Sequence, residues 1–119
     1  MGLTVLDTGG YDTLDLRTDV KDQQIDLRPA GTSSVYGLRG NLVIAYDTII
    51  EKYVAGSGND KIIGNQADNE ILGGDGHDWI EGGEGADTID GGAGTDTASY
   101  RSSDAAVNIY PKHLSLIHI

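Results

Sequence analysis

A nine-residue repeat between residues 55 and 99 constrains this chain more than any other feature. Divided at residues 55, 64, 73, 82 and 91, the chain reads AGSGNDKII, GNQADNEIL, GGDGHDWIE, GGEGADTID and GGAGTDTAS, without an insertion. The sixth position holds Asp60, Asn69, Asp78, Asp87 and Asp96, and the eighth holds Ile62, Ile71, Ile80, Ile89 and Ala98. A fixed period of this length predicts a repetitive structure in which each unit packs on its neighbours.

Each repeat divides into a six-residue turn and a three-residue strand. Glycines in the turn permit backbone angles that are closed to other residues, and they let carbonyl oxygens face a common centre. In the strand the side chains alternate, so position eight points inward and its neighbours point outward. One inward isoleucine per repeat makes a thin core for the nine residues that must be ordered. We therefore expect a bound ligand to supply the missing stability.

The charge of the repeats identifies that ligand as a cation. Ten of the 19 acidic residues lie between 55 and 99, against the single base Lys61. The units match the GGxGxDxUx nonapeptide, a calcium-binding pattern. Calcium takes six to eight oxygen ligands at about 2.3–2.6 Å, which two facing turns supply and one turn does not. Collagen would need glycine at every third position, and a flexible Gly/Ser linker would not hold an isoleucine every nine residues. The predicted cofactor is Ca²⁺.

The repeats resemble those of the RTX (hemolysin-type) family. The resemblance implies an all-β fold, a right-handed parallel β-roll (β-solenoid), in which calcium lies between repeat n and repeat n+2. Repeats 55 and 73, 73 and 91, and 64 and 82 would each share an ion, giving about three ions in the roll. The implied ligands are position-six side chains and turn carbonyls: Asp60, Asn69, Asp78, Asp87, Asp96, Gly56, Gly58, Gly74, Gly76, Gly83, Gly85, Gly92 and Gly94. The 64–72 repeat departs from the pattern at Asn65, Ala67 and Asn69, so the site shared with Asp87 is expected to be the weakest.

The upstream half is similar to the serralysin family of secreted zinc metallopeptidases. The resemblance lies in DTGGYDTLDL at residues 7–16, in GNLVIA at residues 40–45, and in the Ile50-Glu51 pair before the first repeat. It implies a further calcium ion held by Asp7, Gly9, Gly10, Asp12 and Glu51. The family's upstream Arg-x-Gly-x-Thr ligand segment is missing, which would leave this site incomplete. We expect an irregular β cap over residues 1–54, five repeats over 55–99, and a C-terminal strand with a non-matching tail over 100–119.

No catalytic motif accompanies these features, so we expect no enzyme activity from this chain. The three histidines, His77, His113 and His118, do not form the H-E-x-x-H-x-x-G-x-x-H signature of the family. A net charge of -11 argues against nucleic acid as a partner, and the longest apolar run is too short for a membrane span. The resemblance implies secretion through a type I apparatus to the extracellular space, as the C-terminal part of a peptidase whose catalytic domain precedes it.

Two other hypotheses stay open on the sequence. The first is a calcium-dependent adhesive or carbohydrate-associated module of an RTX surface protein or alginate epimerase, for which Trp79 would be a sugar-binding platform. The second is an enzyme in its own right. We predict that Trp79 is instead a partly covered strand residue, and that His77 is a solvated turn residue. Strands are expected around residues 4–6, 12–16, 24–27 and 42–46, and across 104–110.

Overall fold

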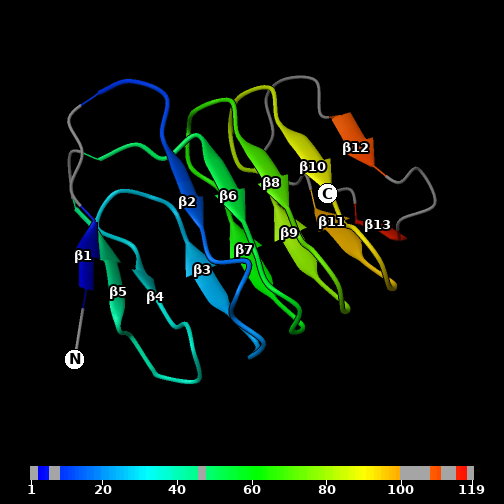
Figure 1. Cartoon of the computed structure of the whole chain (residues 1–119). Coiled ribbons are helices and arrows are strands. Elements are labelled where there is room, and N and C mark those ends of the chain that lie inside the picture. Colours follow the sequence, from blue (N-terminus) through cyan, green and yellow to red (C-terminus); the bar gives the residue numbers. More distant parts are fainter. Residues whose placement is uncertain (1–2, 6–8, 46–47, 100–107, 111–114, 118–119) are drawn as a thin grey trace.

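The computed structural model describes residues 3–5, 9–45, 48–99, 108–110 and 115–117, and these are built from short β-strands (Figure 1). The strands are β1 (Leu3–Val5), β2 (Thr13–Asp15), β3 (Gln24–Asp26), β4 (Thr32–Ser33), β5 (Leu42–Ile44), β6 (Lys52–Val54), β7 (Lys61–Ile63), β8 (Glu70–Leu72), β9 (Trp79–Glu81), β10 (Thr88–Asp90), β11 (Thr97–Ser99), β12 (Asn108–Tyr110) and β13 (Ser115–Ile117). The described part of the chain contains no helix, which confirms the expected all-β class.

Ten of the strands form two parallel sheets of five strands each. The first sheet has the order β12-β10-β8-β6-β2, and the second has the order β13-β11-β9-β7-β3. From β6 to β11, consecutive strands therefore alternate between the two sheets, as Figure 1 shows. Strands of the repeats pair at a distance of 18 residues, with Ile62 opposite Ile80 and Ile71 opposite Ile89. Repeat n thus lies beside repeat n+2, as the family resemblance implies.

The segment before the repeats both extends these sheets and adds a third one. Strand β2 pairs with β6, and β3 pairs with β7, so each large sheet continues into residues 13–26. Strands β1, β5 and β4 form the third sheet. Four of these strands, β1, β2, β3 and β5, lie where the sequence predicts them, whereas β4 and β6 were not predicted.

The C-terminal part contributes one edge strand to each large sheet. Strand β12 pairs with β10 and covers the described end of the strand predicted across 104–110. Strand β13 pairs in parallel with β11, with Ser115 opposite Thr97. The sequence interpretation treated this segment as a non-matching tail and did not foresee a strand there.

The core is the line of inward side chains between the two large sheets. The residues at position eight, Ile62, Ile71, Ile80, Ile89 and Ala98, are all fully buried. Tyr53 and Leu27 continue the core into the N-terminal segment. Strands with one buried residue between two partly exposed ones follow from the alternation of side chains in a three-residue strand.

Two stacks of turns lie along the edges of the sheets and carry the candidate site. The first stack contains the turns at residues 16–23, 55–60, 73–78 and 91–96, which lead from the first sheet to the second. The second stack contains the turns at 64–69 and 82–87, which lead back. Glycine is required here: Gly74 has a φ of 77°, and a methyl group on it would clash with the Gly56 carbonyl oxygen of the turn below.

Candidate metal site

The side chain at position six links each turn to the preceding turn of its stack. In the first stack, the Asp60 N–H donates to Asp78 Oδ1 at 2.8 Å, and the Asp78 N–H donates to Asp96 Oδ1 at 2.9 Å. In the second stack, the Asn69 N–H donates to Asp87 Oδ1 at 2.8 Å. Each of these aspartates therefore has one carboxylate oxygen committed to the stacking of the turns.

The second carboxylate oxygen of the same residues takes part in no hydrogen bond. Oδ2 of Asp60, Asp78, Asp87 and Asp96 is buried and accepts no hydrogen bond; among the described residues only Ser99 Oγ shares this state. A buried carboxylate without a partner is costly, and natural sites compensate it with a cation or a proton. The four atoms occur at one repeat position, so they are a property of the repeat.

The protonation equilibria of these carboxyl groups reflect the same cost. Burial raises the pKa of Asp78 to about 8, and the neighbouring carboxylates of Asp60 and Asp96 add to this rise. Burial also raises the pKa of Asp60 to about 6, and it raises the pKa of Asp96. These groups carry a negative charge at neutral pH more readily when a cation lies beside them.

Space for a cation lies at the first glycine of the turn. A methyl group on Gly73 would lie 2.7 Å from Asp78 Oδ2 and 3.0 Å from the Gly91 carbonyl oxygen, which belongs to the next turn of the stack. A methyl group on Gly82 would likewise clash with Asp87 Oδ2. The missing side chain therefore leaves a cradle between two turns, bounded by a carboxylate oxygen and a carbonyl oxygen. Oxygen donors of this kind suit a hard cation such as Ca²⁺.

The turn carbonyls that the resemblance implicates also face between the turns. The carbonyl oxygens of Gly56 and Gly58 lie against Gly74 and Gly76, and those of Gly74 and Gly76 lie against Gly92 and Gly94. In the second stack, the carbonyl oxygens of Asn65 and Ala67 lie 2.8 Å and 2.7 Å from methyl positions on Gly83 and Gly85. The structure thus brings the candidate residues of each stack together along its axis.

Asn69, the remaining position-six candidate, uses its side chain differently. Its Oδ1 accepts a hydrogen bond from the Asn65 N–H at 3.0 Å within the same turn. Its Nδ2 donates to the Ile50 carbonyl oxygen at 3.0 Å. Both ends of the amide therefore have protein partners, in contrast to the aspartates at the same position.

The second predicted group, upstream of the repeats, is described only in part. Asp7 lies outside the described residues, and Gly9 and Gly10 are exposed. The Asp12 N–H donates to Glu51 Oε2 at 2.8 Å, and the Asp12 carbonyl oxygen accepts from the N–H groups of Glu51 and Lys52. Asp12 and Glu51 thus lie together. In the described ranges, no cluster of three or more His, Cys, Asp or Glu side chains could hold a metal ion.

A ladder at position five and a buried network at the first turn were not foreseen. The Asn59 N–H donates to Asp22 Oδ1, the His77 N–H donates to Asn59 Oδ1, and the Thr95 N–H donates to His77 Nδ1. His77 is exposed, as predicted, and it also links two turns. In the network, buried Asp19 accepts hydrogen bonds from Lys21 N, Tyr36 N and Gln23 Nε2. The ladder follows the spacing of the repeats but has no fixed residue type, and the network has neither a fixed residue type nor a fixed spacing that would show in the sequence.

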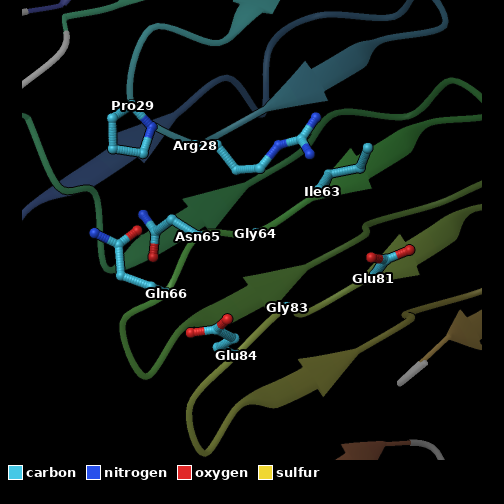
Figure 2. Close-up of a pocket in the computed structure, with 9 residues that line it drawn as sticks. All are labelled: Arg28, Pro29, Ile63, Gly64, Asn65, Gln66, Glu81, Gly83 and Glu84. Carbon is cyan, nitrogen blue, oxygen red and sulfur yellow. The ribbon is translucent and has the colours of Figure 1, made fainter. Parts of the chain in front are cut away.

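Trp79 and a surface pocket complete the inventory of candidate sites. Trp79 is half-buried, as predicted, with the Lys61 ammonium 5.3 Å from its ring centroid. A pocket of about 320 Å³ lies beside the 64–69 turn. Figure 2 shows its lining residues, with Arg28 and Glu84 on opposite sides of Asn65. Arg28 forms an ion pair with Asp26, at 2.7 Å.

The described residues contain no helix that is long and apolar enough to cross a membrane.

Comparisons with known proteins show what this chain is similar to. The model of a family described as the C terminus of the M10 serralysin peptidases matches residues 1–115. A serralysin of Photorhabdus laumondii subsp. laumondii is 50% identical over 62 residues, which are 52% of this chain and 13% of that protein. The metallopeptidase AprA of Pseudomonas marginalis and a serralysin of Proteus mirabilis are each 49% identical over 62 residues, with the same coverage. The matched stretch is thus a small part of each relative.

Proposed function

The chain belongs to the peptidase M10 serralysin C-terminal family, and from this premise we propose that it is a calcium-binding module that folds on Ca²⁺ outside the cell. It is the non-catalytic C-terminal part of a secreted serralysin-like metallopeptidase, linked to a catalytic domain that precedes it. The relatives support this role, because each is a peptidase by name and is several times longer than the matched stretch.

The observation that carries the proposal is that Oδ2 is buried and accepts no hydrogen bond at four aspartates of the repeats. In the proposal, each ion lies between two turns of one stack and takes a carboxylate oxygen from position six. Carbonyl oxygens of the facing turns complete its shell, because one carboxylate falls well short of the six to eight ligands that calcium takes. The first stack holds two ions, between repeats 55 and 73 and between 73 and 91. The second stack holds one, between repeats 64 and 82, and an upstream ion lies near Asp12 and Glu51.

Calcium-dependent folding follows from the free energies that stabilise and destabilise one folded repeat. A single buried isoleucine is a small hydrophobic gain for nine ordered residues, several of them glycines with a high entropy in the unfolded chain. Aligned carboxylates also repel each other in the absence of a cation. The binding energy of the ion therefore becomes folding energy, and the ions complete the two parallel sheets as a right-handed β-roll.

The proposed location follows from the affinity that such sites have. Extracellular calcium modules bind at about 10⁻⁴–10⁻³ M, far above cytosolic calcium concentrations. The repeats would remain unfolded inside the cell, pass a type I secretion channel as an extended chain, and fold on reaching millimolar calcium. The carbohydrate-binding alternative has less support, because the one tryptophan is half-buried under Lys61.

A calcium titration of chelated protein tests the proposal. We expect a cooperative rise of the β signal in far-UV circular dichroism, with a matching change in Trp79 fluorescence. The variant Asp78→Asn should need about tenfold more calcium or more, because Asp78 faces both sites of the first stack. Asp75→Asn is the matched control: it removes the same charge from an exposed position of the same turn.

The titration separates the proposal from its alternatives. Equal shifts in the two variants would mean that net charge, and not the buried carboxylate, sets the affinity. A chain with a full β signal in excess chelator that does not respond to calcium would overturn the proposal.

A further inference from the structure

Exposed apolar side chains gather on two loops of the N-terminal segment. Among the described residues, four large hydrophobic side chains are exposed, and three of them lie on the 16–23 turn and on the loop between β4 and β5. They are Val20, Tyr36 and Leu38, which are 70%, 48% and 54% exposed. A hollow of about 500 Å³ lies beside the second loop, and Leu38 forms part of its wall. Single apolar residues on a surface need no explanation, whereas a contiguous group marks an interaction site.

Hydrogen bonds between the two loops make this group one surface. The Tyr36 N–H donates to Asp19 Oδ2 at 2.6 Å, and the Tyr36 hydroxyl forms a hydrogen bond with Thr18 Oγ1 at 2.9 Å. The Lys21 N–H donates to Asp19 Oδ1 at 2.9 Å, and Lys21 Cγ lies 3.6 Å from a methyl position on Gly37. The exposed side chains of both loops are therefore fixed relative to one another.

The loop between β4 and β5 holds its aromatic side chain in a strained backbone conformation. Tyr36 has a φ of 55°, in the left-handed region that bulky residues avoid. The loop is closed around it, because the Leu38 N–H donates to the Val35 carbonyl oxygen at 3.1 Å and the Gly40 N–H donates to Ser34 Oγ at 2.9 Å. Such strain is found where the surrounding structure enforces it, often at binding sites. A surface held in one conformation loses little entropy when a partner binds.

Two cations border the apolar group. Lys21 and Arg39 are exposed, and neither forms an ion pair within the described part of the chain, where the ion pairs involve Arg17, Arg28 and Lys52. An apolar centre with charged groups at its rim is the usual composition of a protein–protein interface. The complementary surface has apolar side chains at its centre and carboxylates at its rim.

The start of the chain lies next to this surface. Strand β1 pairs in parallel with β5, with Leu3 opposite Leu42, and Leu42 follows the loop at residues 35–40 after a single residue. Figure 1 shows that β1 and β5 both begin at the lower edge of the molecule, where this loop lies. A domain joined ahead of Leu3 would begin beside the loop, and the covalent link would give it a high effective concentration there.

The turn that carries Val20 and Lys21 stacks on an ion-binding turn of the proposed function. The hydrogen bonds between the 16–23 and 55–60 turns run from the Gln23 N–H to Asp60 Oδ1 at 2.8 Å, from the Ser57 N–H to the Asp19 carbonyl oxygen at 3.1 Å, and from the Asn59 N–H to Asp22 Oδ1 at 2.8 Å. Because Asp19 also holds Tyr36, unfolding of the 55–60 turn without calcium removes the support of both loops.

We propose that Val20, Lys21, Tyr36, Leu38 and Arg39 form a docking surface for the domain that precedes this chain in its parent protein, and that calcium assembles this surface. The preceding catalytic domain is part of the proposed function, on which this inference rests. Its surface has apolar groups opposite Val20, Tyr36 and Leu38, and carboxylates opposite Lys21 and Arg39. The two domains therefore dock only after the repeats have bound calcium.

Hydroxyl-radical footprinting with mass spectrometry measures the exposure of these side chains in this chain alone and in its parent protein. In saturating calcium, we expect the oxidation of Tyr36 and Leu38 to be several-fold lower in the parent protein. Tyr11 is the internal control, because it is 64% exposed and lies outside the docking surface, so its oxidation should be equal in both. In excess chelator, Tyr36 and Leu38 should be oxidised equally in both proteins. These comparisons use unmodified proteins.

A substitution in the parent protein identifies the surface. Leu38→Asp places a carboxylate against the apolar centre of the partner, so the oxidation of Tyr36 in calcium should rise to its level in this chain alone. Ala93→Asp is the matched control, because it adds the same charge at an exposed apolar position in the last turn of the first stack. It should leave Tyr36 protected. Circular dichroism in calcium checks that both variants keep their β signal.

The outcomes separate the docking surface from the calcium function. Equal oxidation of Tyr36 and Leu38 in the two proteins, with a β signal that depends on calcium, would overturn the docking surface and leave the calcium function standing. A β signal and a footprint that ignore calcium would overturn the calcium function together with the assembly of the surface. Protection of Tyr36 that increases with the concentration of this chain alone would assign the surface to a second copy, against the inference.

Discussion

At the scale of single residues, the aspartate at position six has two oxygens with separate roles. Oδ1 accepts the N–H of the preceding turn in the stack, and Oδ2 is buried without a protein partner. The hydrogen bond to Oδ1 explains why the stacked turns are in register. The burial of Oδ2 without a hydrogen bond explains why this arrangement costs free energy in the absence of a cation. Asn69 shows the alternative, an amide that satisfies both of its ends inside the protein.

The raised pKa values predict how pH acts on the chain without calcium. Burial raises the pKa of Asp60 to about 6 and that of Asp78 to about 8, from an ordinary 3.8. The folded state then holds protons more tightly than the unfolded state, so its stability falls as pH rises through about 6 and then about 8. We expect the chelated chain to gain β signal when it is acidified from about pH 9 to about pH 5, and calcium affinity to fall over the same range.

Circular dichroism of chelated protein across this pH range, with a calcium titration at each pH, measures both effects. The variant Asp78→Asn should show a smaller pH dependence than the unmodified chain. A β signal in chelator that is constant from about pH 9 to about pH 5 would contradict the assignment of these carboxyl groups.

Residue roles could be read from the sequence where they follow the period. The four aspartates and the turn glycines were identified because each recurs every nine residues. Gln23 was missed because the N-terminal segment does not share that period: it lies 37 residues before Asp60, its partner in the ladder. The donor role of Asn65 and Asn69 was missed because a departure from a consensus does not show whether the new side chain donates or accepts.

At the scale of the turn, the prediction concerns steric fit between neighbours in a stack. Gly74 and Gly37 have almost the same backbone angle, with φ of 77° and 76°, so alanine strains both, at a cost of about 1–2 kcal/mol. Only at Gly74 would the new methyl group also clash with a carbonyl oxygen, that of Gly56, whereas at Gly37 the nearest atom is Lys21 Cγ at 3.6 Å. Gly74→Ala should therefore lose more stability than Gly37→Ala, together with calcium affinity.

Urea unfolding in saturating calcium compares the free energies of unfolding of the two variants. A calcium titration then compares their affinities. Equal losses of stability in both variants would show that backbone strain alone, and not the close approach of stacked turns, accounts for the glycine at this position.

At the scale of the whole molecule, chain dimensions report how much of the fold needs calcium. The radius of gyration of the folded chain is 13.1 Å, whereas a fully unfolded chain of this length has one of about 35 Å. In chelator we expect a radius of gyration far above 13.1 Å, because the chain needs bound calcium to fold. Small-angle X-ray scattering in calcium and in chelator measures both states. A chelated chain that keeps a radius of gyration near 13.1 Å would contradict calcium-dependent folding.

The general architecture was predictable because it repeats. The period gave the turn-strand division and the inward isoleucines, and the family resemblance implied the pairing of repeat n with repeat n+2; the structure contains all three. The ends were less predictable, because they depend on contacts between segments that occur once. Strand β13 is an example: its three residues, Ser-Leu-Ile, carry no repeat signal, and they are placed by pairing with β11.

The 18-residue pairing distance has a consequence for how such a gene can change in length. Copying or losing two adjacent repeats adds or removes one strand in each sheet, and every later residue keeps its side of the molecule. Copying or losing a single repeat would move all later strands to the opposite sheet, and β12 and β13 would exchange places. The number of repeats in relatives of this chain should therefore vary in steps of two. Relatives would then differ in length, but all of them would have an odd number of repeats, as this chain does.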